Sequence, residues 1–137
     1  MAENSRNVRL YRGLAVRRRE DADVLVAAER YSGAIYLGGY VAECVLKALI
    51  LRHTAAGQET QALNEVKSIG HNLERLKTRA IETGSVHFPA EVIRALNSLN
   101  YWSSELRYDL KTPGRKDVSA FFRALKVIGE WSERVSW

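Results

Sequence analysis

The sequence contains little cysteine and little proline, and each shortage excludes a class of protein. Cys44 is the single cysteine among 137 residues, so no internal disulfide can form and no cysteine cluster can hold structural zinc. The two prolines, Pro89 and Pro113, lie between apolar periodic segments and not inside them. The chain must therefore be held together by a hydrophobic core, for which its length is sufficient.

The sequence also lacks a long uncharged stretch. The longest such stretch, residues 31–42, is too short and too rich in tyrosine and glycine to span a bilayer. The first twenty residues hold six arginines and no apolar core of a secretory leader. A hydrophobic fraction of 46% with 27% charged residues is typical of a globular protein. We therefore expect a cytoplasmic protein with one domain over residues 1–137 and no association with a membrane.

Basic residues exceed acidic residues, and the excess lies at the start of the chain. The 21 Lys and Arg against 16 Asp and Glu give a formal charge of +5 at pH 7. Six arginines between positions 6 and 19 precede Glu20, Asp21 and Asp23. Such a cluster can bind phosphate groups. It can equally be a solvated helix surface, because Arg17 and Arg19 stand four residues before Asp21 and Asp23.

Apolar residues recur at three- and four-residue steps along most of the chain, which predicts helices. No alternating strand pattern or hairpin turn is visible in the sequence. Residues 1–11 are expected to form a loose N-terminal arm, and residues 52–70 a long connection with one short helical turn. The sequence thus predicts an all-α, up-and-down bundle of four or five helices. The expected helices span about 12–29, 31–51, 72–83, 90–112 and 117–135, the last with Asp117 as its N-cap.

Two glycines interrupt the strongest of these helices. Gly38 and Gly39 lie in the interior of the helix expected over residues 31–51. Glycine at such a position costs about 1 kcal/mol relative to alanine. We therefore expect a neighbouring helix to approach the backbone closely at this point.

A polar and aromatic stripe runs along the same helix. Tyr36, Tyr40, Glu43 and Lys47 recur at i, i+4, i+7 and i+11, so they share one face. Glu43 stands among apolar residues and therefore requires a cation or a hydrogen-bond donor. Lys47 is the local candidate, and Arg107 is the distant one. The stripe is either a structural ion pair that joins two helices or one wall of a cleft for a nucleotide or RNA.

Other chemistries have little support in the sequence. His53, His71 and His87 are far apart, and none has a second histidine or a carboxylate at the spacing of helical metal ligands. Neither a glycine-rich phosphate loop nor a Gly-x-Ser-x-Gly motif is present. Cys44 is expected to be a small buried apolar residue. The sequence thus predicts no metal and no cofactor.

Three segments occur in the order that is found in one known family. YSGAIYLGGYVAECVLKALI at residues 31–50 is similar to its second helix, GHNLERL at 70–76 to the start of its third, and LRY at 106–108 to the end of its fourth. Over about residues 12–135 the chain thus resembles the HEPN domain, the "higher eukaryotes and prokaryotes nucleotide-binding" superfamily. The resemblance implies a helical bundle that forms homodimers and binds nucleotide or RNA. Family members often act with a nucleotidyltransferase partner in toxin–antitoxin or other defence systems. Together with the polar and aromatic stripe, the resemblance indicates a ligand site at Tyr40, Glu43, Lys47, His71, Arg107 and Tyr108.

The ribonuclease motif of this family is missing from the chain. Many members carry an arginine followed four to six residues later by a histidine, but no histidine follows Arg107. Metal-free RNA cleavage needs a base near neutral pKa and a cation that stabilises the transition state. The remaining candidates are His71 as base, Arg107 as cation and Tyr108 as proton donor. We therefore expect a non-catalytic binding module; the alternatives are a ribonuclease with a composite site at a dimer cleft and a purely structural, antitoxin-like dimerisation module.

Large aromatic residues give a second reason to expect self-association. A small bundle has little room to hide many aromatic rings, so a surplus favours burial between two copies. The residues concerned are Trp102, Phe121, Phe122, Trp131 and Trp137. The expected assembly is a homodimer.

Overall fold

The computed structural model of the protein describes residues 2–84, 86–108 and 112–135, with side chains described for all of these except 2–5 and 103–108. The described residues form helices and no strand, as the sequence predicted. Their number is six and not four or five. They are α1 (Ala2–Ala27), α2 (Tyr31–Arg52), α3 (Glu59–Ile69), α4 (Leu73–Glu82), α5 (Ala90–Tyr108) and α6 (Arg115–Arg134).

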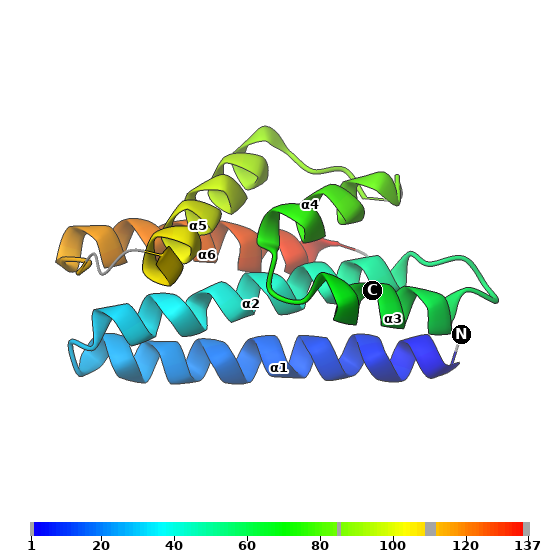
Figure 1. Ribbon diagram of the computed structural model, residues 1–137, viewed down its shortest axis with the longest axis horizontal. Coiled ribbons are helices and arrows are strands. Elements are labelled where there is room, and N and C mark those ends of the chain that lie inside the picture. The colour runs from blue at the N-terminus through cyan, green and yellow to red at the C-terminus, as the bar shows by residue number, and fades with distance from the viewer. Residues whose placement is uncertain (1, 85, 109–111, 136–137) are drawn as a thin grey trace.

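The second helix forms the centre of the bundle. α1 and α2 make a long antiparallel hairpin, whereas α4, α5 and α6 lie on the other side of α2 (Figure 1). α2 packs against each of the other five helices. Every residue from Val41 to Leu51 is buried. The predicted helix over residues 31–51 is thereby confirmed as the core helix.

The composition of α2 also meets the length and hydropathy requirements of a membrane span. Its 22 residues include a window with a mean hydropathy of 1.6. Within that window, 78% of the residues are buried inside the bundle. The apolar character of α2 is therefore used for packing against the other helices.

The helices predicted after residue 72 and after Pro89 are confirmed as α4 and α5. Asn72 caps α4, because its side-chain oxygen accepts a hydrogen bond from the backbone N–H of Arg75 at 3.0 Å. Gly84 follows the helix with φ of 68°, a conformation that glycine adopts without strain.

Two stretches that were expected to lack regular structure are helical. α1 begins at Ala2, so the residues expected to form a loose arm extend the first helix. Val8 anchors them, with only 5% of its surface exposed. Residues 59–69, expected as part of a connection, form α3 and bury Ala62, Val66 and Ile69 at helical spacing. A narrow apolar stripe among polar residues was enough to dock this helix.

The start of the last helix was also placed wrongly. α6 begins at Arg115 with Gly114 at the N-cap, and not with Asp117 as its cap. The Asp117 carboxylate reaches back one turn and accepts the backbone N–H of Gly114 at 2.8 Å. Asp117 therefore stabilises the helix start from the third helical position, as the acidic member of a capping box does.

Gly38 allows α2 and α6 to come together, which confirms the predicted close approach at this position. A Cβ atom added to Gly38 would lie 2.5 Å from Cε1 of Phe121 and 3.5 Å from Cδ2 of Leu125. The space beside α2 is thus filled by the aromatic ring of Phe121, which is fully buried.

The aromatic argument for self-association is wrong. Trp102, Phe121 and Trp131 are each less than 8% exposed within the single chain. Phe122 is half-buried under the guanidinium of Arg19, whose Cζ lies 5.3 Å from the ring centroid. Trp137 lies outside the described residues. Three of the five rings are thus buried in the core of the single chain, so the number of aromatic residues gives no reason to expect a dimer.

Candidate functional site

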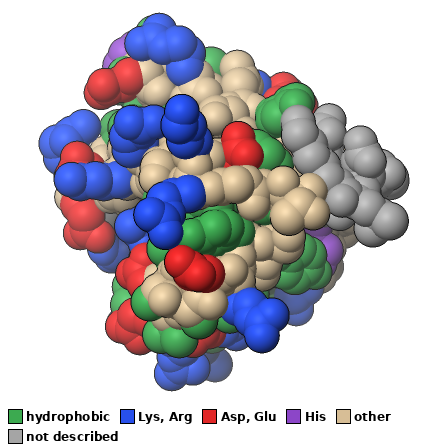
Figure 2. Space-filling view, turned by 90° about the vertical axis from the view of Figure 1, so that its left-hand side faces the viewer, with side chains coloured by type: hydrophobic (Ala, Val, Ile, Leu, Met, Phe, Trp, Pro, Cys, Tyr) green, Lys and Arg blue, Asp and Glu red, His purple; other side chains and the backbone are tan. Residues whose placement is uncertain are grey.

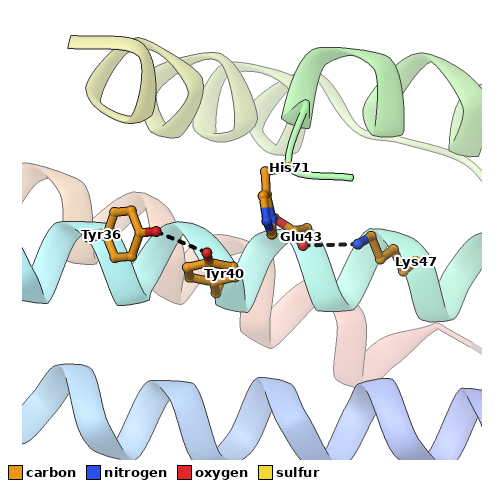
Figure 3. A network of polar contacts seen from close by, with 5 residues as sticks. All are labelled: Tyr36, Tyr40, Glu43, Lys47 and His71. Carbon is orange, nitrogen blue, oxygen red and sulfur yellow. Dashed lines mark hydrogen bonds and ion pairs between the residues drawn. The ribbon is translucent and has the colours of Figure 1, made fainter. Parts of the chain in front are cut away.

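The polar stripe on α2 converges on one buried carboxylate (Figure 3). The side chain of Glu43 is 9% exposed, and its Oε2 accepts a hydrogen bond from Nζ of Lys47 at 3.0 Å. The other oxygen, Oε1, lies 2.9 Å from Nδ1 of His71, which reaches down from the segment before α4. Lys47, one of the two candidate partners that the sequence offered, thus pairs with Glu43. The contact with His71 adds a second partner from a distant part of the chain.

Lys47 is buried as deeply as Glu43. Its side chain is 8% exposed, and its Nζ lies 5.8 Å from the centroid of the Tyr11 ring on α1. The carboxylate and the ring therefore both compensate the ammonium group for its lost hydration. Because each charge has its partners inside the fold, Glu43 and Lys47 form a fixed support behind His71.

His71 is held on one side and open on the other. Its side chain is 58% exposed, although Nδ1 contacts the buried carboxylate. Gly70, with φ of 65°, and the N-cap Asn72 set the path of the chain on either side of it. An ionised carboxylate can only accept a hydrogen bond, so Nδ1 of His71 is the donor. This arrangement fixes the orientation of the ring and leaves Nε2 for a ligand.

Two tyrosines continue from His71 along the surface of α2. The rings of Tyr40 and His71 meet edge to face with centroids 5.1 Å apart. Tyr36 meets Tyr40 in the same way at 5.2 Å, and their hydroxyl oxygens are 3.0 Å apart, within hydrogen-bonding distance. We call Tyr36, Tyr40 and His71 the aromatic row (Figure 3). The row runs from the held imidazole to Tyr36, which is 60% exposed.

The structure brings together four of the six residues for which a ligand site was predicted. Tyr40, Glu43, Lys47 and His71 form one continuous network. The other two, Arg107 and Tyr108, belong to the last turn of α5, and their side chains lie outside the described part of the structure. α5 packs against α2. The pairing of Arg107 with Glu43 stays a prediction.

Sequence reasoning missed the contact between Glu43 and His71. The two residues are 28 positions apart and lie on different segments, so no periodicity connects them. The one indication was the Gly-His pair before α4, which belongs to one of the three segments that carried the family resemblance. Tyr36 was placed in the stripe but not in the ligand site, because its hydrogen bond to Tyr40 does not follow from spacing alone.

The other potential reactive groups are separate from this network. Burial, and then the nearby Glu43 carboxylate, raise the pKa of the Cys44 thiol to about 11. Cys44 is 6% exposed, which confirms the expected buried apolar role. Nε2 of His53 is buried without a hydrogen-bond partner in the described structure. Burial lowers the pKa of this histidine, and the positive charge of the adjacent Arg52 lowers it further. Among described residues, no group of three His, Cys, Asp or Glu side chains is placed to hold a metal ion.

A groove with a volume of about 540 Å³ lies between α1, α2 and α6. Its apolar lining includes Ala15, Val41, Val45 and Leu125. Val41 and Val45 point away from the face of α2 that carries Glu43, because successive helical residues are about 100° apart. The groove and the aromatic row therefore lie on different sides of the core helix.

The arginines of α1 are partly neutralised by their neighbours. Arg19 pairs with Asp23 at 3.1 Å, as the i,i+4 spacing predicted, whereas Asp21 pairs with Arg18 at 2.9 Å. At the end of the molecule near the turn between α1 and α2, basic and acidic side chains are interspersed (Figure 2). Two of the six arginines, Arg18 and Arg19, are thus paired with acidic residues, as the interpretation of a solvated helix surface predicts.

The chain matches a model of a known protein family over most of its length. A model of the HEPN domain matches residues 8–135. This range includes the aromatic row, Glu43 and Lys47, and it extends from α1 to the residue after α6. No curated protein and no solved structure matches the chain.

Proposed function

Because the chain belongs to the HEPN domain family of helical nucleotide-binding modules, we propose that it binds a phosphate of a nucleotide or of RNA at His71. One observation carries the proposal: a largely exposed imidazole is held by a buried carboxylate through Nδ1 at 2.9 Å. Nε2, when protonated, donates to a phosphate oxygen from a ring whose orientation is already set. Binding therefore costs little side-chain entropy at this residue.

The surrounding residues have separate roles in this proposal. Glu43 and Lys47 hold His71 from behind and do not touch the ligand, because both side chains are buried. The ring of Tyr40 packs edge to face against the imidazole and helps to hold its orientation. Arg107 and Tyr108 remain the proposed contributions of α5, with the guanidinium as a second phosphate ligand and the phenol as a hydrogen-bond donor.

The contact of Glu43 with His71 also favours a second function, metal-independent RNA cleavage. With Nδ1 donating to the carboxylate, a neutral His71 presents Nε2 as an acceptor for the proton of a 2′-hydroxyl group. The missing Arg-to-His motif of the family's ribonucleases favours binding over cleavage. We therefore propose binding as the function, and cleavage of RNA would be the result that replaces this proposal.

Replacing His71 separates these functions. We expect His71→Gln to weaken the binding of a fluorescently labelled single-stranded RNA about 10- to 100-fold, because a charge-assisted hydrogen bond of about 1.5–3 kcal/mol is lost. His87→Gln is the matched control, since His87 is an exposed histidine outside the network. Fluorescence anisotropy measures affinity, and thermal unfolding checks that both variants are folded.

Two results would contradict the proposal. Equal affinity of the parent and the His71 variant for this RNA would exclude His71 as the phosphate ligand. RNA cleavage by the parent in the presence of a chelator, lost in His71→Gln and kept in His87→Gln, would replace the binding function by the ribonuclease. We expect the parent to leave the RNA intact.

The biological setting is proposed from the family alone. We propose a nucleotidyltransferase-type protein as partner, in a toxin–antitoxin or defence context in the cytoplasm. The family resemblance is the support for this setting. A nucleotidyltransferase that is encoded beside this chain and copurifies with it would be the supporting result.

We also propose that a second copy of the chain covers the groove between α1, α2 and α6. Arg12 and Arg19 on the α1 wall outnumber its one acid, and Glu130 and Glu133 on the α6 wall outnumber its one lysine, although Asp23 already pairs with Arg19 and Lys126 with Glu130. A two-fold axis that sets α1 of each protomer against α6 of the other would therefore join opposite charges. Val16, which is 59% exposed at this groove, would become buried.

A charge at the groove is expected to abolish this dimer. Val16→Glu should shift the mass measured by light scattering at tens of micromolar from two chains to one, because it buries an unpaired carboxylate in the interface. Val24→Glu is the control, since Val24 is 67% exposed on the same helix but does not line the groove. A monomeric parent protein would remove the proposed dimer.

A further inference from the structure

We propose that Tyr36 forms the base-binding part of the site, so that the ligand is a single-stranded nucleic acid or nucleotide that stacks one base on this ring. The inference rests on the proposed phosphate contact at His71 and adds the chemical class of the group beside it. It follows from the exposure of Tyr36, from the contacts that hold its ring, and from its place in the aromatic row.

Tyr36 presents an aromatic ring to solvent, although burial of such a ring is favourable. Its exposed fraction is 60%, whereas Phe121, Trp102 and Trp131 are buried in the core. Nucleobases stack on exposed aromatic side chains, and this stacking does not require a particular base. An exposed tyrosine beside a proposed phosphate ligand is therefore suited to an unpaired nucleotide.

The Tyr36 ring is held in place before any ligand binds. Its hydroxyl group lies 3.0 Å from that of Tyr40, and the two ring planes are inclined by 77°. An edge-to-face contact occupies at most one face of the ring, so the other face is left for stacking. Since the ring is already oriented, stacking costs less side-chain entropy than it would at a freely rotating tyrosine.

The row connects this ring to His71 in two steps. Centroid distances of 5.2 and 5.1 Å separate Tyr36 from Tyr40 and Tyr40 from His71. A base on Tyr36 and a phosphate at His71 can therefore belong to the same nucleotide or to adjacent nucleotides. The carboxylate nearest to the row, Glu43, is 9% exposed and paired with Lys47, so its repulsion of an anionic ligand is small.

Binding of two probes distinguishes stacking from phosphate contact. The probes are a single-stranded RNA octamer and inorganic pyrophosphate, which carries no base. We expect Tyr36→Ala to weaken binding of the RNA about 5- to 100-fold and to leave that of pyrophosphate unchanged. Tyr36→Trp should preserve RNA affinity, because indole stacks at least as well as phenol. Tyr101→Ala is the control, since Tyr101 is 50% exposed on α5 and is not part of the row.

The outcomes separate this inference from the proposed function. If Tyr36→Ala binds RNA as tightly as Tyr101→Ala while His71→Gln binds it weakly, base stacking on Tyr36 is excluded and the phosphate site stands. If Tyr36→Ala weakens pyrophosphate binding as much as RNA binding, Tyr36 acts by positioning His71 through Tyr40, and stacking is again excluded. If the parent binds neither probe, the proposed function itself fails.

Discussion

Glu43→Gln is expected to lower the free energy of unfolding by about 3–5 kcal/mol, because it leaves the ammonium group of Lys47 buried without a counter-charge. The carboxylate and the ammonium are 3.0 Å apart and 9% and 8% exposed, so neither can recover its hydration by a small movement. Urea denaturation at pH 7 measures the change. The effect should be among the largest of any single polar substitution in the described structure.

Two further variants test the cause of this loss. The double replacement Glu43→Leu with Lys47→Met should be less destabilised than Glu43→Gln, since it removes both buried charges. Asp21→Asn breaks the exposed contact with Arg18 and should change stability by less than about 1 kcal/mol. A loss at Glu43 no larger than that at Asp21 would show that Lys47 is solvated, contrary to the burial described.

Gly38→Ala is expected to lower the free energy of unfolding by about 1–3 kcal/mol, although alanine is the better helix former. The added Cβ atom would lie 2.5 Å from Cε1 of Phe121, far inside van der Waals contact. Phe121 is fully buried, so its ring can yield only if other core residues move. The midpoint of urea denaturation should fall accordingly.

Gly13→Ala provides the matched comparison. Gly13 also lies inside a helix, but apart from the adjacent backbone of α1 no atom is within 4 Å of the position that its Cβ would take. Because Gly13 also lines the groove proposed as the dimer contact, the comparison is made in the Val16→Glu background. There the substitution should raise stability by up to about 1 kcal/mol through helix propensity. If Gly38→Ala stabilises the protein as Gly13→Ala does, α2 and α6 are not packed as closely as the structure places them.

Helical periodicity predicted the fold wherever a helix has a broad apolar face. α2 follows directly from apolar residues at intervals of four, and the break at Pro89 marks the region before α5. α3 was not predicted because its buried apolar residues, Ala62, Val66 and Ile69, form only a narrow stripe in a polar segment. The early start of α1 was not predicted because Val8 lies among arginines, a local composition that is typical of a solvent-exposed segment. In both cases packing against the core outweighs the local pattern.

The candidate site could be predicted only as far as one helix determines it. Spacing along α2 correctly placed Tyr36, Tyr40, Glu43 and Lys47 on one face, since that depends only on helical geometry. The contact between His71 and Glu43 depends on how α3 and the segment around Gly70 lead the chain back over α2. Such a contact is decided by tertiary packing, and the sequence of either segment alone does not encode it.

The central position of α2 also imposes an order on folding during synthesis. The hairpin of α1 and α2 joins neighbours in sequence and can form early, because closing a short loop costs little entropy. The part of α2 around Gly38 packs against Phe121 of α6, the last helix of the domain. Until α6 leaves the ribosome, this apolar surface stays exposed to solvent and to other nascent chains. α6 thus closes the core and ends the period in which the chain is most prone to aggregate.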